Sequence, residues 1–199
     1  MKARILLPTI ALALLGATAP TMAHTGVGDT RGFAHGFFHP VSGVDHILAM
    51  VSVGLFAAHL GGRALWLVPA TFVSIMAVGG AIGMSGIEIP FVETGIALSV
   101  VVLGLVLALQ ISPPVGVAMG LVGFFAIFHG HVHGAEMPTD ASGLGYALGF
   151  MTATATLHTV GIGLGIAIAT AGKLISTRVV RVGGGLMTLA GVGLLAGWL

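Results

Sequence analysis

Two imidazoles and a carboxylate, those of His39, His46 and Asp45, stand at the start of an apolar segment long enough to enter a membrane. An ionised carboxylate in hydrocarbon costs kilocalories unless it has a partner, so such a group is a functional candidate by default. Ser42 followed by Asp45 has the form of a capping box, which predicts a helix that begins near Gly43. We therefore expect Asp45 and His46 in its first turn, where a carboxylate meets the positive end of the helix dipole.

A second group of imidazoles ends another apolar segment, in the sequence F-H-G-H-V-H-G. His129 and His133 are four residues apart and share one helix face, a spacing that lets two imidazoles hold one ion. His131 points elsewhere on a regular helix, and its role as a ligand or as a packing residue stays open. Glu136 follows within one turn of His133.

Further polar side chains in or beside apolar segments are Glu93, His158, His35 and His59. Glu93 is either a ligand or a partner of a helix dipole, His35 is open between ligand and packing, and His59 is interpreted as a packing residue. The chain has no cysteine, which excludes disulfides and thiolate metal sites. Imidazole suits Zn, Cu, Fe and Ni, so a histidine-rich site with few carboxylates predicts a late first-row divalent metal ion.

The composition predicts the kind of protein that positions these groups. Hydrophobic residues make up 56% of the 199 residues and charged residues 7%, with a mean hydropathy of +1.11. A soluble domain carries about 25% charged residues, so this chain is predicted to be an integral membrane protein. A basic patch interleaved with aromatic residues is missing from the sequence, which argues against nucleic-acid binding. The formal net charge of +1 decides nothing.

The first 23 residues resemble a signal peptide, with Lys2 and Arg4 before a short apolar core and a small-residue cleavage site that ends at Ala23. We expect cleavage there and a mature chain that starts at His24, outside a bacterial inner membrane. A free amine beside the His24 imidazole would be a chelating pair. The alternative is a retained N-terminal anchor helix.

Six apolar runs follow, at about 44–60, 64–84, 91–109, 115–133, 144–171 and 182–199, and most approach the ~20 residues needed to cross a ~30 Å hydrocarbon core. The fold class is therefore all-α, a polytopic bundle of six transmembrane helices after a cleaved signal peptide. The fifth run is overlong, so it is expected to be tilted or broken. With the mature N-terminus outside, the inner loops hold Arg63, Lys173, Arg178 and Arg181 and the outer segments only Arg31, which satisfies the positive-inside rule.

This topology brings Asp45, His46, Glu93 and the fourth-run imidazoles to the outer face of the membrane. His158 lies about 14 residues into the fifth run, ~21 Å deep at 1.5 Å per residue. We expect a cluster of imidazoles and carboxylates at the outer mouth and one imidazole further along a path.

The residues H-P-x-x-G-x-D-H-x-L-A-M, from His39 to Met50, resemble the signature of the HupE/UreJ family. The stretch from His129 to Glu136 is similar to the family's second histidine-rich motif, and Glu93 and His158 stand in the expected places. The resemblance covers nearly the whole chain. It implies a six-span nickel or cobalt permease that supplies metal for hydrogenase, urease or cobalamin. The segment H-T-G-V-G-D-T after residue 23 is poorer in histidine than in many members, which weakens the expectation of a metal-capturing tail.

We expect a transporter rather than an enzyme, with Ni²⁺ or Co²⁺ as the transported ion and no permanent cofactor. The expected metal ligands are His39, Asp45, His46, Glu93, His129, His133 and His158, followed by His24, His35, His131 and Glu136. The sequence leaves open the oligomeric state, the driving force and the choice among Ni, Co and Zn. The rivals are an intramembrane metal-dependent hydrolase, for which H-E-x-x-H is lacking, and a metal-binding assembly subunit without transport.

Overall fold

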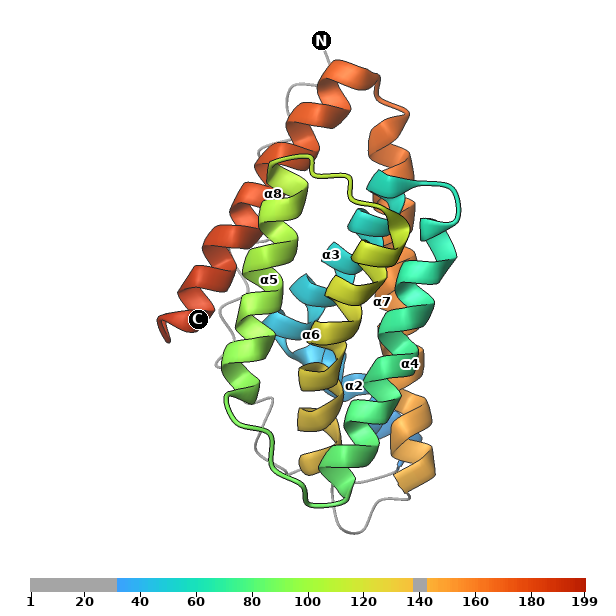
Figure 1. The fold of residues 1–199 in the computed structure, drawn as a ribbon, viewed down its shortest axis with the longest axis vertical. Coiled ribbons are helices and arrows are strands. Elements are labelled where there is room, and N and C mark those ends of the chain that lie inside the picture. The colour runs from blue at the N-terminus through green and yellow to red at the C-terminus, as the bar shows by residue number, and fades with distance from the viewer. Residues whose placement is uncertain (1–31, 138–142) are drawn as a thin grey trace.

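The computed structural model describes residues 32–137 and 143–199, and every regular element in these ranges is an α-helix. The predicted signal peptide, residues 1–23, and His24 lie outside the described residues. The helices are α2 (Phe33–Ser42), α3 (Val44–Leu60), α4 (Ala64–Met84), α5 (Val92–Ala108), α6 (Val115–Ala135), α7 (Gly143–Ala169) and α8 (Lys173–Leu195). From α3 to α8 they alternate in direction along the bundle (Figure 1).

Four of the described helices, α4, α6, α7 and α8, are long and apolar enough to cross a membrane. A fifth span is formed if α2 and α3, which meet at an angle of 86°, count as one bent crossing. The remaining apolar helix, α5, has 17 residues. The chain is thus an all-α membrane protein with four to five candidate spans, and the sixth expected crossing depends on α5. The overlong fifth run is one continuous helix of 27 residues, so it is not broken.

Two element starts differ from the sequence prediction. A helix, α2, precedes the bend at Gly43, before the first of the predicted apolar runs. The capping box is not formed, because the Ser42 hydroxyl donates to the carbonyl of His39 (2.7 Å) and α3 has no side-chain cap. Helix α8 begins at Lys173, not at residue 182, because its first turns contain helix-compatible basic residues between apolar ones, which interrupt the apolar run without ending the helix.

Glycines let the helices of the bundle approach one another closely. A Cβ atom added at Gly130 or Gly134 of α6 would collide with the carbonyl of Met76 or Gly80 on α4. On α3 and α7, Gly54 and Gly161 face each other in the same way. Backbone contact of this kind supplies van der Waals packing where lipid removes the hydrophobic driving force between helices.

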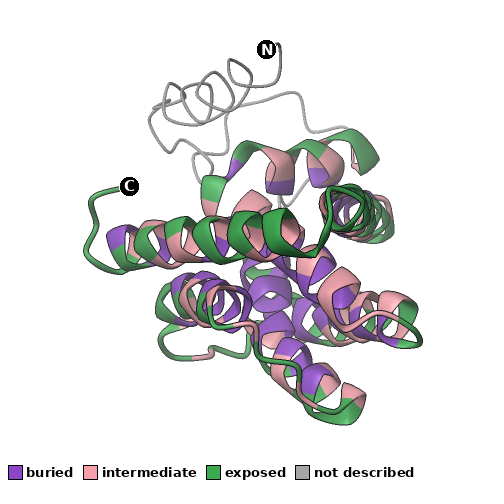
Figure 2. Cartoon of the chain, turned by 90° about the horizontal axis from the view of Figure 1, so that it is seen from above, coloured by how far each residue is buried: buried purple, intermediate pink, exposed green. Residues whose placement is uncertain are grey.

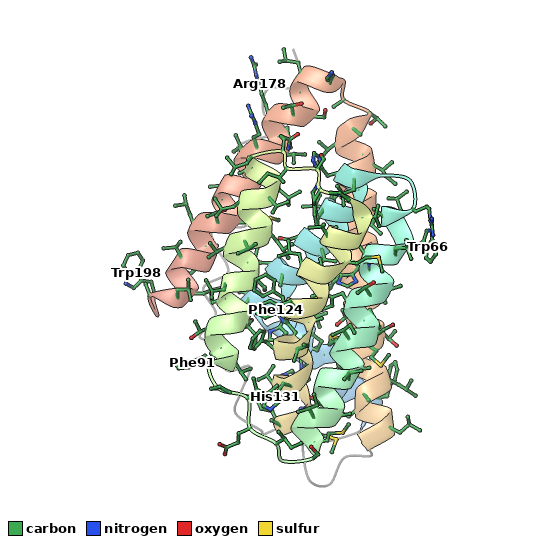
Figure 3. The ribbon with its side chains drawn as sticks, in the orientation of Figure 1. Trp66, Phe91, Phe124, His131, Arg178 and Trp198 are labelled. Carbon is green, nitrogen blue, oxygen red and sulfur yellow. The ribbon has the colours of Figure 1, made fainter. Side chains whose placement is uncertain are left out.

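The two ends of the bundle carry opposite charge. All Lys and Arg residues of the described ranges lie at the end where α3, α5 and α7 finish: Arg63, Lys173, Arg178 and Arg181. All described Asp and Glu residues lie at the other end: Asp45, Glu88, Glu93 and Glu136. Figure 3 shows Arg178 and Trp66 toward the first end and His131 and Phe91 toward the second. Between the ends, exposed residues cover the outer faces of the helices and buried residues the inner ones (Figure 2).

Candidate metal site

Imidazoles from three helices meet at the acidic end of the bundle. The ring of His133 on α6 lies 5.0 Å from that of His39 on α2 and 4.8 Å from that of His46 on α3, centroid to centroid. One turn earlier on α6, the ring of His129 lies 5.1 Å from His46. The expectation that His129 and His133 share one face of a helix is confirmed, since both contact His46. Three of the four rings are completely or almost completely buried.

Asp45 determines which nitrogen of His46 carries a hydrogen. One carboxylate oxygen, Oδ1, lies 3.0 Å from Nδ1 of His46 and accepts its backbone N–H at 2.8 Å. An ionised carboxylate only accepts hydrogen bonds, so Nδ1 is the donor and Nε2 keeps its lone pair. Nε2 is buried and has no hydrogen-bond partner. A side chain at Gly43 would meet the Asp45 oxygen at 2.7 Å, which explains the glycine in this motif.

Ser99 on α5 has the same effect on His129. Its hydroxyl donates to the carbonyl of Ile96 (2.6 Å) and lies 3.0 Å from Nε2 of His129. Because the single hydroxyl hydrogen is used on Ile96, the serine oxygen accepts the Nε2 hydrogen of His129. The other nitrogen, Nδ1, then holds a lone pair, and it too is buried without a partner. A histidine that binds metal through one ring nitrogen usually donates the N–H of its other ring nitrogen to such an outer partner.

The outer end of the imidazole group is open to the surface. Nε2 of His39 lies 3.7 Å from a carboxylate oxygen of Glu136, and the two side chains are 10% and 33% exposed. The ring of His35 stacks on that of His39 at 6.1 Å and lies 5.7 Å from Tyr146. Tyr146 is 1% exposed, and its hydroxyl has no hydrogen-bond partner. Glu136 and His35 therefore belong to this outer layer.

Phe72 of α4 stands between the imidazole group and His158. Its ring lies 5.6 Å from that of His129 and 5.1 Å from that of His158, centroid to centroid. Phe72 is fully buried and His158 is 1% exposed, and neither ring nitrogen of His158 has a hydrogen-bond partner. His158 is thus deeper in the bundle than the other imidazoles, and an aromatic ring separates it from them.

Two of the expected ligands lie away from this group. His131 turns to the loop before α5, and its Nε2 donates to the carbonyl of Ile87 at 2.8 Å. Glu93 is exposed in the first turn of α5, where a carboxylate meets the positive end of the helix dipole. A role for either in metal binding stays a prediction.

The described imidazoles form a series rather than one closed site. The order runs Glu136, His39, His133, His46, His129, Phe72, His158, and side-chain exposure falls from 33% at the first to 1% at the last. Among residues 32–137 and 143–199, no three His, Asp or Glu side chains are grouped closely enough to hold one metal ion. Sequence reasoning missed Phe72, Ser99 and Tyr146. A hydroxyl inside an apolar run was the signal for Ser99 and for Tyr146, the single tyrosine of the chain.

Comparisons with known proteins identify the family of the chain. The family model described as HupE / UreJ protein matches residues 12–194. The chain is 48% identical over 190 residues to the Protein HupE of Rhizobium leguminosarum bv. viciae, which covers 94% of this chain and 97% of that protein. No solved structure matches the chain. With the family model covering nearly its whole length, the chain belongs to the HupE/UreJ family of membrane proteins.

Proposed function

We propose that this chain is an uptake permease for a late first-row divalent cation, Ni²⁺ first and Co²⁺ next. One observation carries the proposal: His46 and His129 lie ring to ring, and each keeps one buried nitrogen without a hydrogen-bond partner. Leaving such a nitrogen unpaired costs about 1–3 kcal/mol. A cation bound by both lone pairs would offset that cost, and borderline cations such as Ni²⁺ suit imidazole.

The series of side chains supports passage of the ion rather than permanent storage. Glu136 and His39 would take the cation at the surface, and His133, His46 and His129 would replace its water by nitrogen ligands. Ions move through a protein when each binding step is favourable enough to enter and weak enough to leave. Phe72 would then be the last barrier before His158.

Asp45 has a different role in this proposal from the one that we expected from the sequence. Its carboxylate oxygen lies against His46, so it would orient the imidazole and supply negative charge through it. A negative partner raises the basicity of a ligating histidine. Asp45 would therefore act on the metal through His46 rather than as a separate ligand.

The membrane arrangement completes the proposal. We place six crossings in the bilayer, with α2 and α3 as one bent crossing and α5, ~25 Å long at 1.5 Å per residue, as the short one. The basic end faces the cytoplasm and the acidic, imidazole-bearing end the periplasm of a bacterial inner membrane, in accord with the positive-inside rule. Cleavage of residues 1–23 remains part of this proposal.

Purified protein in liposomes with a nickel-sensitive dye inside tests the function. The wild-type protein is expected to pass Ni²⁺ across an otherwise tight bilayer, and Asp45→Asn is expected to lose most of that flux. Glu88→Gln is the matched control, because Glu88 is an exposed carboxylate at the same end, in the loop before α5. Binding of nickel without flux would indicate an assembly subunit or a resident metal site instead.

A further inference from the structure

A second polar site lies at the basic end of the bundle. A pocket of about 160 Å³, open on one side, lies between the ends of α3, α5 and α7 and the start of α8. Its polar lining comes from His59, Gln110, Ser176 and Thr177, and the rest of the lining is apolar or glycine. Nε2 of His59 shares a hydrogen bond with the hydroxyl of Ser112 at 2.9 Å.

This pocket is separate from the imidazole series. His46 and His59 are both on α3, but at about 100° per residue their spacing places them on opposite sides of the helix. His46 faces α6, whereas His59 faces the pocket beside α7 and α8. The pocket is therefore not a continuation of the path that the imidazoles mark.

The charges around the pocket favour an anion. Lys173, Ser176, Thr177 and Val180 are spaced by three and four residues, so they share one face of α8, and the last three line the pocket. Helix α8 starts there without a side-chain cap and without an acidic residue in its first turn, so its positive dipole end is not neutralised. All described carboxylate side chains lie at the opposite end of the bundle.

The backbone at Gln110 holds the side chain of this residue beside the pocket. Gln110 has φ 56°, in the left-handed region, and it follows the C-cap of α5. The N–H of Ile111 bonds to the carbonyl of Val106, and the N–H of Gln110 to that of Leu107, which is a Schellman motif. Glycine is the favoured residue at this position, and the side chain of the glutamine that stands there instead lines the pocket.

We propose that this pocket binds the phosphate group of an anionic phospholipid. The Ser176 hydroxyl donates to the carbonyl of Lys173 (3.1 Å), and one Gln110 amide hydrogen goes to the carbonyl of Leu107 (2.8 Å). The Thr177 hydroxyl and the second Gln110 amide hydrogen would therefore be the donors to the phosphate, and Lys173 would supply charge. The apolar part of the lining, with Leu55 and Val180, accommodates the start of the acyl chains, a feature that a free phosphate would not use. Basic pockets between transmembrane helices bind such head groups.

Thermal unfolding of the purified full-length protein in detergent tests the proposal. Phosphatidylglycerol is expected to raise the unfolding temperature more than phosphatidylcholine does at the same mole fraction. Lys173→Gln is expected to weaken the apparent affinity for phosphatidylglycerol about fivefold, the effect of one basic residue near a head group. Arg178→Gln is the matched control, because it removes the same charge from the opposite face of α8, where Arg178 stands away from the other helices (Figure 3).

Gln110→Gly distinguishes the site from a general loss of stability. Glycine relieves the left-handed backbone, so the variant is expected to unfold at the wild-type temperature or above it without lipid, yet to lose the selective response to phosphatidylglycerol. Equal responses to the two lipids, or equal losses in Lys173→Gln and Arg178→Gln, would overturn the proposal. A full response to inorganic phosphate alone would also overturn it and would identify free phosphate as the ligand. Nickel binding measured on the same samples is expected to be unchanged, which keeps this test separate from that of transport.

Discussion

Ser99→Ala is the most informative substitution in the imidazole series, because it changes a partner of His129 and leaves the imidazole in place. The Ser99 oxygen is the group that accepts the Nε2 hydrogen of His129. Without it, the imidazole is free to place its hydrogen on Nδ1 or to rotate. The nitrogen that we assign to the metal then loses its lone pair or its direction.

Two costs follow from this substitution, and they differ in size and in what they affect. The substitution removes the acceptor of a buried imidazole N–H, which lowers the free energy of unfolding by about 1–3 kcal/mol. The loss of an outer partner typically lowers metal affinity about 10–100-fold. We therefore expect a modest loss of stability and a large loss of nickel affinity in the same protein.

Ser52→Ala is the matched control. Ser52 is also a fully buried serine in a helix, and its hydroxyl donates to the carbonyl of Leu48 at 2.6 Å. Its other contact is the sulfur of Met187 at 3.1 Å, not an imidazole. This variant loses a hydrogen bond but leaves no buried imidazole nitrogen without a partner, so it should lose about 1 kcal/mol of stability and keep its nickel affinity.

The assay is a calorimetric titration of each purified variant with Ni²⁺, together with flux into liposomes at nickel concentrations below saturation. If Ser99→Ala binds nickel within about twofold of the wild type, far less than the loss expected for an outer partner, the assignment of the His129 tautomer is wrong. An equal loss in Ser52→Ala would show that both effects come from packing.

Three further outcomes are expected. Phe72→Leu should raise nickel flux at unchanged protein level, because a smaller side chain replaces the ring that separates His129 from His158; flux equal to or below that of the wild type would contradict a barrier at this ring. Gly130→Ala should lower the unfolding temperature through its collision with the Met76 carbonyl on α4, whereas Gly120→Ala, with open space around it, should not; equal stability of the two would refute the proposed α4–α6 contact. Nickel flux should fall when the external solution is acidified enough to protonate the imidazoles, since a protonated imidazole binds no metal; flux that rises with acidity would contradict imidazole ligation.

Most helices could be predicted because apolar runs mark them directly. The bounds of α3 and α4 agree with the predicted runs residue for residue. The start of α8 was missed because its first turns are basic, and a helix can begin before it becomes apolar. Helix α2 was missed because it is short, rich in glycine and interrupted by Pro40, so no run of apolar residues marks it.

The sequence predicted which side chains could bind a metal ion, but not which side chains contact them in the folded protein. The expectation that imidazoles from separate helices meet at one end of the bundle is confirmed for His39, His46, His129 and His133. The hydroxyl of Ser99 inside an apolar run could have marked it as a candidate, but its contact with His129 and that of Phe72 were not predictable, because both are made across the bundle. Asp45 as a metal ligand stays a prediction, and its contact with its neighbour His46 was not predicted.

X-ray absorption at the nickel edge of the metal-loaded protein tests the central claim most directly. We expect scattering from imidazole rings in the wild-type protein and its loss or reduction in His46→Ala and His129→Ala. Nickel surrounded by oxygen alone, or a spectrum unchanged in both variants, would show that the ion does not meet these nitrogens.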